Sequence, residues 1–218
     1  MVKIIEILEE FLQEIEKNNP YKLIAKGGTA LSLFYLNHHR ESEDLDFDTV
    51  LDKSQYKNIE SYFISILEHL KKKGILTDYR KGKSGLAATN RYHINLVLET
   101  YKEFYTKIDV DFVKPIKNIK KKGALFYYSL ERLFIGKCIT FINRKEFKDI
   151  YDIKHMLPKI DIETFRSNPN VVKLIDDLIN AMQSEDMPSL YKSAFRNVDL
   201  RFKDLKEPQI KTFTEKLI

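Results

Sequence analysis

The sequence of 218 residues contains a single cysteine, Cys138, and no tryptophan. One cysteine cannot form an intramolecular disulfide, and no Cys/His cluster has the spacing of a zinc site. These absences favour a reducing compartment, so we expect a cytoplasmic protein. No stretch reaches the roughly 20 uninterrupted apolar residues that a membrane-spanning helix needs. Acidic residues interrupt the apolar segment 1–18, which we expect to form a soluble amphipathic helix.

Internal repeats and low-complexity linkers are also absent, and 43% of the residues are hydrophobic, which is enough for a sizeable core. The formal net charge is +5, and lysines cluster within residues 71–73 and 114–122. Such clusters suit the phosphates of a nucleotide or an RNA, but an ordinary solvated surface explains them equally well. Composition therefore does not select a function.

The order of hydrophobic patterns predicts an α+β fold. The segments with strand patterns are residues 21–26, 44–50, 75–80, 91–98 and 107–113. The segments with helical patterns after the first helix are residues 29–36, 55–73, 129–143, 148–157 and 170–182, with one or two more towards the C-terminus. Strands first and helices afterwards indicate an α+β part, residues 1–120, and a helical part, residues 121–218. We place the seam near residues 114–128.

Alternating acidic residues mark the strand predicted at residues 44–50. Side chains alternate across a strand, so Asp44, Asp46 and Asp48 share one face. Carboxylates this close repel one another unless a cation lies between them, and oxygen ligands of this kind suit Mg²⁺. A solvent-facing edge strand would also tolerate the alternation. The strand alone therefore leaves open both a metal site and an exposed edge.

Gly27 and Gly28 stand between a predicted strand and a predicted helix. Glycine lets backbone N–H groups come close to a phosphate, and a helix N-terminus adds a partial positive charge. A Gly-Gly turn by itself is common in proteins. Together with the acidic strand that follows, it predicts a triphosphate between Gly27-Gly28 and a metal ion held by Asp44 and Asp46.

The segment KGGTALSLFYLNHHRESEDLDFD, residues 26–48, resembles the first motif of the AbiEii/AbiGii toxin family, within the polymerase-β-like nucleotidyltransferase superfamily. In that motif a Gly-Gly-Thr-Ala-Leu helix precedes Arg-x-Ser-x-Asp-hydrophobic-Asp. The residues in matching places are Gly27, Gly28, Thr29, Arg40, Ser42, Asp44 and Asp46. The resemblance implies that Gly28 and Thr29 contact phosphate and that Ser42 supports it, with Gly27 and Arg40 also among the nucleotide-binding residues. It implies that the two aspartates hold the metal ion.

A third carboxylate is expected from the strand predicted at residues 107–113, which offers Asp109 and Asp111 on one face. By resemblance Asp109 matches the family better, and it would hold a second metal ion or deprotonate the acceptor hydroxyl. The alternative is a polar residue of an edge strand. The family's middle motif, a lysine followed by an arginine, is poorly reproduced. Lys83 and Arg91 are the nearest candidates, which leaves the basic residue that grips the nucleotide open.

Residues 129–153, SLERLFIGKCITFINRKEFKDIYDI, resemble the family's last motif, with Lys137, Arg144, Asp149 and Asp152 in matching places. The resemblance makes Lys137 a nucleotide-binding and catalytic residue and Asp149 a catalytic one. Independently, Lys137 falls in an apolar helical stripe, so it needs an anionic partner if buried, and a phosphate would serve. The alternative is a lysine that bends out to solvent. Asp149 and Asp152 also lie in a first turn, where acidic residues favour the helix dipole without further function.

The resemblance covers about residues 20–157 and implies a mixed-sheet nucleotidyltransferase core followed by a helical part. It implies a Mg²⁺-dependent enzyme that transfers a nucleotidyl group from a nucleoside triphosphate to a hydroxyl, with the 3′ end of tRNA as the expected acceptor. It also implies the toxin of a toxin–antitoxin or abortive-infection system, neutralised by a separately encoded antitoxin. The alternatives are a small-molecule or protein acceptor, and a non-catalytic interaction module with the same fold.

Overall fold

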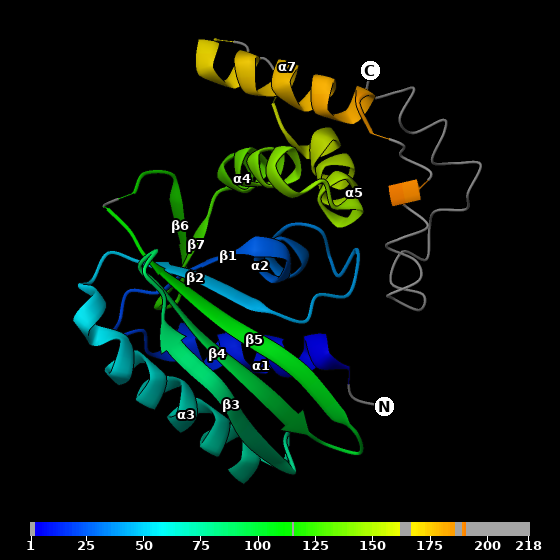
Figure 1. The fold of residues 1–218 in the computed structure, drawn as a ribbon. Helices are drawn as coiled ribbons and strands as arrows, with labels where there is room; N and C mark the ends of the chain where they lie inside the picture. Colours follow the sequence, from blue (N-terminus) through cyan, green and yellow to red (C-terminus); the bar gives the residue numbers. More distant parts are fainter. Residues whose placement is uncertain (1–2, 115, 162–166, 186–188, 191–218) are drawn as a thin grey trace. The chain divides into compact units, whose positions relative to one another are not determined.

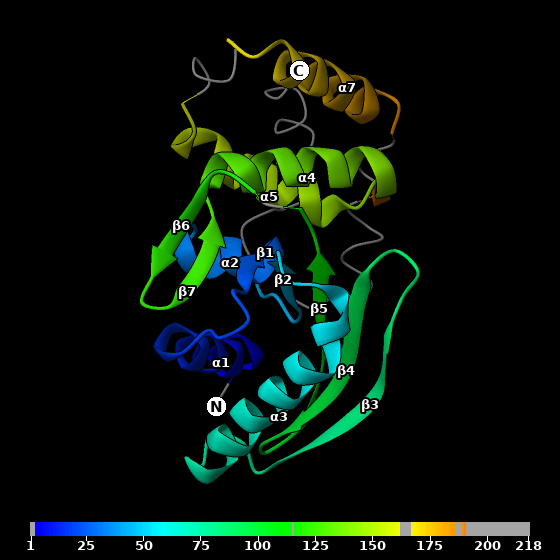
Figure 2. The ribbon, with the colours of Figure 1, turned by 90° about the vertical axis from the view of Figure 1, so that its left-hand side faces the viewer.

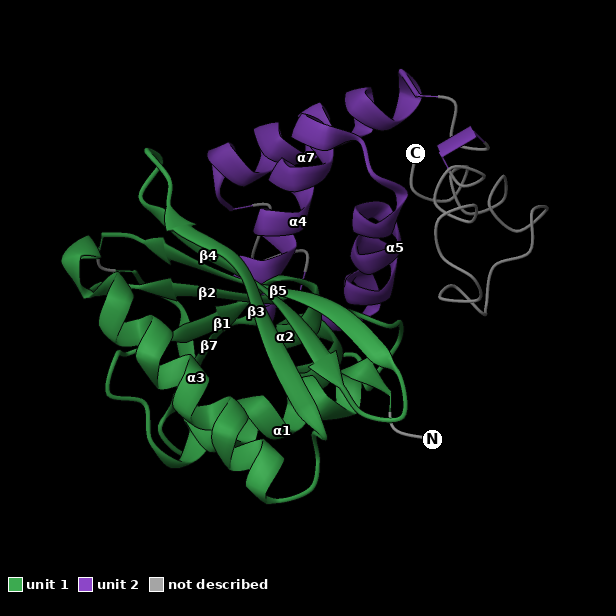
Figure 3. Cartoon of the chain, turned by 60° about the horizontal axis from the view of Figure 1, so that its bottom comes forward, with its two compact units in different colours: residues 1–129 green, residues 130–218 purple. Residues whose placement is uncertain are grey.

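The computed structural model of the protein describes residues 3–114, 116–161, 167–185 and 189–190 (Figure 1). The chain divides into two compact units, Met1–Ser129 and Leu130–Ile218 (Figure 3). In the described residues, the first unit combines a sheet with helices, and the second unit contains helices. This arrangement confirms the predicted α+β class. Residues 121–129, expected in the helical part, lie in the first unit.

The sheet of the first unit has seven strands in the order β3-β4-β5-β2-β1-β7-β6 within the described residues. Its strands are β1 (Ile24–Lys26), β2 (Leu45–Thr49), β3 (Asp78–Leu86), β4 (Arg91–Glu99), β5 (Glu103–Phe112), β6 (Ile119–Lys122) and β7 (Leu125–Tyr128). β2 runs parallel to β5 and β1 runs parallel to β7, whereas the other neighbours are antiparallel. The sheet is therefore mixed, as the resemblance implies.

Two parts of this sheet differ from the sequence prediction. β6 and β7 form a hairpin where the sequence predicts a seam between the two parts. The sequence does not reveal β6 because the lysines of residues 120–122, exposed on this edge strand, hide the usual apolar alternation. β3 continues to Leu86 through residues where a glycine turn is predicted, and its pairing with β4 shifts register between Lys81 and Ser84. A β-bulge of this kind accommodates glycines inside a strand.

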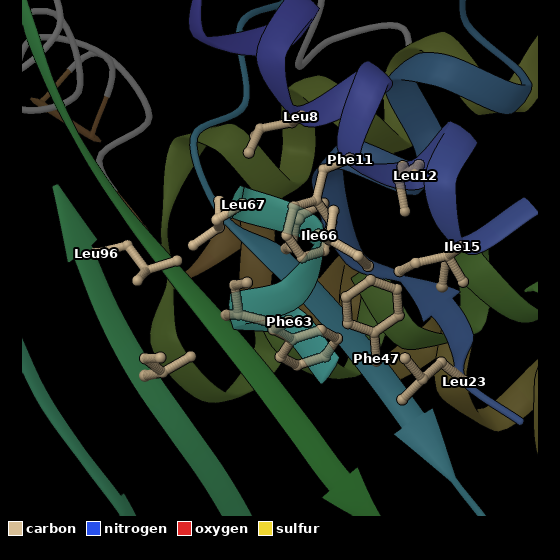
Figure 4. Packing of buried hydrophobic residues seen from close by; sticks show 14 of the residues in the cluster. Leu8, Phe11, Leu12, Ile15, Leu23, Phe47, Phe63, Ile66, Leu67 and Leu96 are labelled. Carbon is tan, nitrogen blue, oxygen red and sulfur yellow. The ribbon is translucent and has the colours of Figure 1, made fainter. Parts of the chain in front are cut away.

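Helices α1 (Ile4–Lys17) and α3 (Tyr56–Lys72) lie along one face of the sheet (Figures 1 and 2). Figure 4 shows Phe11 of α1 and Phe63 of α3 packed with Phe47 of β2. The ring centroid of Phe63 lies 5.6 Å from that of Phe11 and 5.8 Å from that of Phe47. Each of the three side chains is at most 2% exposed. Burial of side chains of this size contributes about 1.5–3 kcal/mol each. The apolar residues of β2 thus place one face of the sheet in the hydrophobic core.

Two further elements complete the first unit. Helix α2 (Gly27–Phe34) follows β1 without a connecting loop and packs on β1 and β2. The 3₁₀ turn η1 (Lys53–Gln55) precedes α3, with the Asp52 side chain accepting a hydrogen bond from the backbone N–H of Ser54. The N-terminus of α2 therefore begins at the end of β1, next to the acidic strand β2.

The second unit contains α4 (Leu130–Arg144), α5 (Phe147–Met156), the 3₁₀ turn η2 (Leu157–Lys159) and α7 (Pro169–Gln183) in its described residues. α4 packs on both α5 and α7. The three helices lie within two residues of their predicted ends. The helices predicted beyond residue 190 lie outside the described residues. No helix in the described part of the chain is both long and apolar enough to cross a membrane.

Candidate active site

The strand register brings aspartates together on the face of the sheet that does not carry Phe47. In the parallel pair β2 and β5, Asp46 lies beside Asp109 and Asp48 lies beside Asp111. Neighbouring strands are about 4.8 Å apart, so each of these carboxylates has another as its direct neighbour. The structure thus joins two segments that lie far apart in the sequence into one acidic patch. It brings together Asp46 and Asp109 as the sequence predicts.

The outer pair of aspartates, Asp48 and Asp111, is neutralised by cations. Lys26 Nζ lies 2.5 Å from Asp111 Oδ2 and also pairs with Asp48. Arg91 donates two hydrogen bonds to Asp111, at 2.7 and 2.8 Å, and the Tyr128 hydroxyl donates to Asp48. This network ties together β1, β2, β4, β5 and β7. Asp111 therefore stabilises the sheet. Arg91, a candidate for binding the nucleotide, forms its ion pair with this carboxylate.

The electrostatics of the outer pair follow from this geometry. Burial by itself would lower the pKa of Lys26, but the charges of Asp48 and Asp111 outweigh it and raise that pKa. Burial would likewise raise the pKa of Asp111, but Arg91 and Lys26 hold the pKa below its usual range. Lys26 and Asp111 therefore both stay charged at neutral pH, and the ion pair between them persists.

In the inner pair, Asp46 and Asp109, the carboxylate of Asp109 is incompletely satisfied. Asp109 is only 3% exposed, and its Oδ2 lies 2.8 Å from Lys107 Nζ and 3.8 Å from Arg91 Nη1. Its other oxygen, Oδ1, is buried and has no hydrogen-bond partner. A buried carboxylate oxygen without a partner is costly, and a bound cation would satisfy it. The hydrogen bond to Asp109 also raises the pKa of Lys107.

This donor set fits a hard divalent cation. Carboxylate oxygens are the ligands that Mg²⁺ prefers, and Mg²⁺ commonly uses one or two of them together with substrate phosphates and water. Within the described residues, no group of three or more His, Cys, Asp or Glu side chains is arranged to hold a metal ion. Of the three predicted ligands, the structure brings Asp46 and Asp109 together and does not arrange Asp44 with them as a third. The candidate site centres on Asp46 and Asp109, with the unpartnered Oδ1 as its distinguishing feature.

Asp44 is placed by a contact with the neighbouring strand. It immediately precedes β2, and its Oδ1 accepts a hydrogen bond from the backbone N–H of Lys107 at 3.1 Å. Thr29, only 1% exposed, donates its hydroxyl to the Asp44 carbonyl, and its Oγ1 lies 2.8 Å from Ser42 Oγ. Thr29 and Ser42, both expected near phosphate, thus connect α2 to the residues that lead into β2.

Each of the two glycines leaves room for one charged side chain. Gly27 has φ +73°, and a Cβ added there would lie 2.2 Å from Asp46 Oδ2. A Cβ added at Gly28 would lie 2.4 Å from Arg40 Nη2 and 3.1 Å from Ser42 Oγ. The glycines therefore let a carboxylate and a guanidinium approach the first turn of α2. A helix N-terminus beside an arginine is a favourable place for an anionic phosphate group.

The second unit holds a separate buried cluster. Lys137 of α4 is 8% exposed, and its Nζ lies 3.0 Å from Asp149 and 2.7 Å from Asp152, both on α5. Arg144 donates two hydrogen bonds to Asp149, at 2.8 and 3.0 Å. The alternative that Lys137 bends out to solvent is therefore wrong. Its anionic partners are two carboxylates of the same unit, so its burial does not require a phosphate.

Sequence reasoning missed two cations of the acidic patch, Lys107 and Lys26. Lys107 stands two residues before Asp109, so strand alternation places both on one face, and this signal could have been read from the sequence. Lys26 directly precedes the glycine turn, but only the pairing of β1 with β2 shows that it faces the acidic patch. Lys83 is exposed on β3 and forms no ion pair with the described residues.

A shallow groove of 340 Å³ lies beside this patch on β3, β4 and β5. It was not foreseen from the sequence. Its lining residues are Asp44, Gly82, Asn95, Leu96, Val97, Tyr105, Thr106 and Lys107.

Comparisons with known proteins identify the family and the fold of this chain. The sequence model of the AbiEii family, described as nucleotidyl transferase toxins of type IV toxin–antitoxin systems, matches residues 10–217. The crystal structure of JHP933 from Helicobacter pylori is similar, with a TM-score of 0.68, 19% identity, and coverage of 100% of this chain and 94% of that chain. Another structure from H. pylori, provisionally assigned as a nucleotidyltransferase, has a TM-score of 0.66, 21% identity, and coverage of 100% and 97%.

At these identities the two structures support the fold alone, and none of the curated proteins matches the chain. The family match extends over almost the entire sequence and defines a nucleotidyltransferase. More particularly, the chain belongs to the AbiEii nucleotidyl transferase toxin family of type IV toxin–antitoxin systems. This confirms the resemblance drawn from residues 26–48 and 129–153. Membership also implies an antitoxin as a partner.

Proposed function

We propose that this toxin transfers a nucleotidyl group from a nucleoside triphosphate to the 3′-terminal hydroxyl of a tRNA, in the presence of Mg²⁺. The observation that carries the proposal is the Asp46/Asp109 pair. A buried oxygen of Asp109 has no hydrogen-bond partner, and Asp46 reaches the first turn of α2, where Arg40 also lies. This arrangement offers a place for a cation and a place for an anion next to each other. The family match supports the type of reaction.

Asp46 and Asp109 would hold Mg²⁺, with Asp44 available from the residue before β2. When bound, the ion would supply positive charge that stabilises the transferred phosphoryl group and the leaving pyrophosphate. The alternative role of Asp109 is that of the base: if Asp46 and Asp44 hold the ion, Asp109 Oδ1, which has no hydrogen-bond partner in the protein, would take the proton of the acceptor hydroxyl. Its buried position and the contact with Lys107 hold the carboxylate in one orientation.

The triphosphate would bind at the first turn of α2. Backbone N–H groups after Gly27 and Gly28 and the guanidinium of Arg40 attract phosphate oxygens there, while Thr29 and Ser42 hold the turn against Asp44. In the reaction the acceptor oxygen forms a bond to the α-phosphorus. The bond from this phosphorus to the bridging oxygen breaks, and pyrophosphate leaves. The protein contributes position and charge, without a covalent intermediate.

Lys137 and Asp149 remain predicted nucleotide-binding and catalytic residues. Within the second unit their charges are matched by each other, by Asp152 and by Arg144, so the cluster holds α4 against α5. A phosphate that reached Lys137 would have to compete with two buried carboxylates. The first role of this cluster is therefore to stabilise the packing of α4 on α5, and nucleotide binding by Lys137 stays a prediction.

The proposed partners are a nucleoside triphosphate, a tRNA and a separately encoded antitoxin, and the proposed place of action is the cytoplasm.

Cys138 is buried, and burial raises the pKa of its thiol to about 12. This thiol therefore stays protonated and unreactive, as befits a structural residue.

The decisive experiment incubates the purified protein with each of the four labelled nucleoside triphosphates, Mg²⁺ and total tRNA. We expect label from at least one nucleotide in the tRNA, and no label with Asp109→Asn. Label that enters a small molecule such as an aminoglycoside, or a protein, would replace the proposed acceptor with that class. Absence of transfer to any acceptor would favour a non-catalytic interaction module, although the paired acidic residues at Asp46 and Asp109 argue against it.

A further inference from the structure

The order of strands separates the two sides of the acidic patch. Across the sheet, the pairings run from Lys26 on β1 to Asp46 on β2, Asp109 on β5 and His93 on β4. The α2 N-terminus, which follows β1, lies on one side of the two carboxylates. The groove on β3, β4 and β5 lies on the other side. If the triphosphate binds at α2, the groove is left for the second substrate.

Tyr105 gives this groove an aromatic surface. It is 71% exposed and lies on the same face of β5 as Lys107 and Asp109, because the three residues alternate along one strand. Its hydroxyl lies 3.3 Å from Glu103 Oε2. Tyr105 and Asp109 lie four positions apart along the strand, a distance of roughly 13 Å. The terminal nucleotides of a single strand can span such a distance.

The remaining lining residues suit a flat, polar-edged group. Asn95 donates from Nδ2 to the Lys83 carbonyl at 3.1 Å, which fixes the plane of its amide. Gly82 lies opposite, where a Cβ would be in ordinary van der Waals contact with Asn95 Cβ, at 3.4 Å. Its volume of 340 Å³ falls in the range of small-ligand sites, about 300–1,000 Å³.

The chemistry of the lining favours a nucleotide over the other acceptors. The groove contains one carboxylate, Asp44, and one ammonium, Lys107, so it is not the acidic pocket that a polycationic antibiotic needs. An aromatic ring and a lysine on one strand provide stacking for a base and a charge for its phosphate. Single-stranded nucleic acids are bound in this way irrespective of sequence.

We propose that the groove on β3, β4 and β5 binds the unpaired 3′ end of the RNA acceptor, with a base stacked on Tyr105. This inference rests on the proposed function and adds to it the place where the acceptor binds. The acceptor strand would run along β5 from Tyr105 past Lys107 and bring its terminal hydroxyl to Asp109. Tyr105 is then a specificity residue for single-stranded ends, separate from the residues that bind the triphosphate.

The test measures binding without catalysis. The probe is a fluorescent RNA hairpin with a four-nucleotide 3′ overhang, titrated without Mg²⁺ and without nucleotide. We expect Tyr105→Ala to weaken binding about 5- to 150-fold, the usual effect of losing one stacked base. Tyr105→Phe keeps the ring and should bind as the wild type does. Tyr101→Ala is the matched control, because Tyr101 is 53% exposed in the turn before β5 but does not line the groove.

A blunt hairpin without the overhang provides the second comparison. Support for the inference requires that the overhang strengthen binding to the wild type and that Tyr105→Ala remove this gain. If Tyr105→Ala binds the overhang like the wild type, while the wild type still transfers nucleotides to tRNA, the groove is not the acceptor site and the proposed function stands. If the wild type labels only a protein or a small molecule, both the proposed acceptor and this inference are wrong.

Discussion

The acidic patch of the first unit and the buried cluster of the second unit use the same residue types in different ways. In the patch, the cations that face Asp109 belong to side chains 41% and 49% exposed, and one buried oxygen has no partner. In the cluster, Asp149 and Asp152 are fully buried and receive their ion pairs from Lys137 and Arg144. An incomplete set of partners leaves room for a ligand, whereas a complete one stabilises the fold.

The largest effect is expected from a substitution of Lys137 in the buried cluster. Lys137→Met should lower stability by about 3–5 kcal/mol, because it leaves buried carboxylates without their counter-ion. Thermal melting followed by circular dichroism measures the effect. The double variant Lys137→Met/Asp152→Leu should recover most of the loss, because it removes a buried charge of each sign. An unchanged melting temperature in Lys137→Met, with transfer reduced by orders of magnitude, would instead give Lys137 the predicted role on the nucleotide.

The second test lies within β2. Asp46→Asn should reduce transfer about 100- to 1,000-fold, the range seen when one preorganised electrostatic group is removed, while the melting temperature stays near that of the wild type. Asp48→Asn is the matched control, since Asp48 shares the strand face but is held by Lys26 and Tyr128. We expect Asp48→Asn to lose stability more than activity. Equal activity losses in both variants would remove the distinction between inner and outer pairs.

Two glycines with the same backbone angle provide a test of whether Asp46 belongs to the metal site. Gly27 and Gly74 both have φ +73°, but only at Gly27 would a Cβ meet another side chain, that of Asp46. Gly74→Ala should therefore cost only the backbone strain, about 1–2 kcal/mol. Gly27→Ala should add to this strain a loss of Mg²⁺ affinity, which calorimetry with the ion alone can detect. Identical Mg²⁺ affinities in the two variants would exclude Asp46 from the metal site.

The smallest expected effect concerns Lys107. Its ammonium occupies Asp109 Oδ2 at 2.8 Å, so a metal ion must share that carboxylate with it. Lys107→Met should raise Mg²⁺ affinity about two- to fivefold, the scale of a partly exposed ion pair. Lys102→Met serves as the control, because Lys102 is an exposed lysine whose ammonium lies over the Tyr101 and Phe104 rings. A lower affinity in Lys107→Met alone would show that Lys107 assists metal binding.

Much of the fold could be predicted from the sequence because local patterns dictate it. Alternation predicts β2, β4 and β5, and the helical stripes predict α3, α4, α5 and α7 to within two residues. The exceptions are local conflicts. The exposed lysines of β6 hide an edge strand, and the glycines of β3 imitate a turn inside a strand that a β-bulge allows to continue.

For the site, the sequence predicts the residues of the nucleotidyltransferase motifs, because the spacing of Gly27, Asp44 and Asp46 is local. The partner of each charge depends on the tertiary structure. The register of β2 against β5 places Asp109 beside Asp46 and leaves Asp111 to Arg91. The packing of α4 on α5 likewise gives Lys137 two carboxylates. The physical reason is that ion pairing depends on distances of a few ångströms between segments far apart in the chain, which no local pattern records.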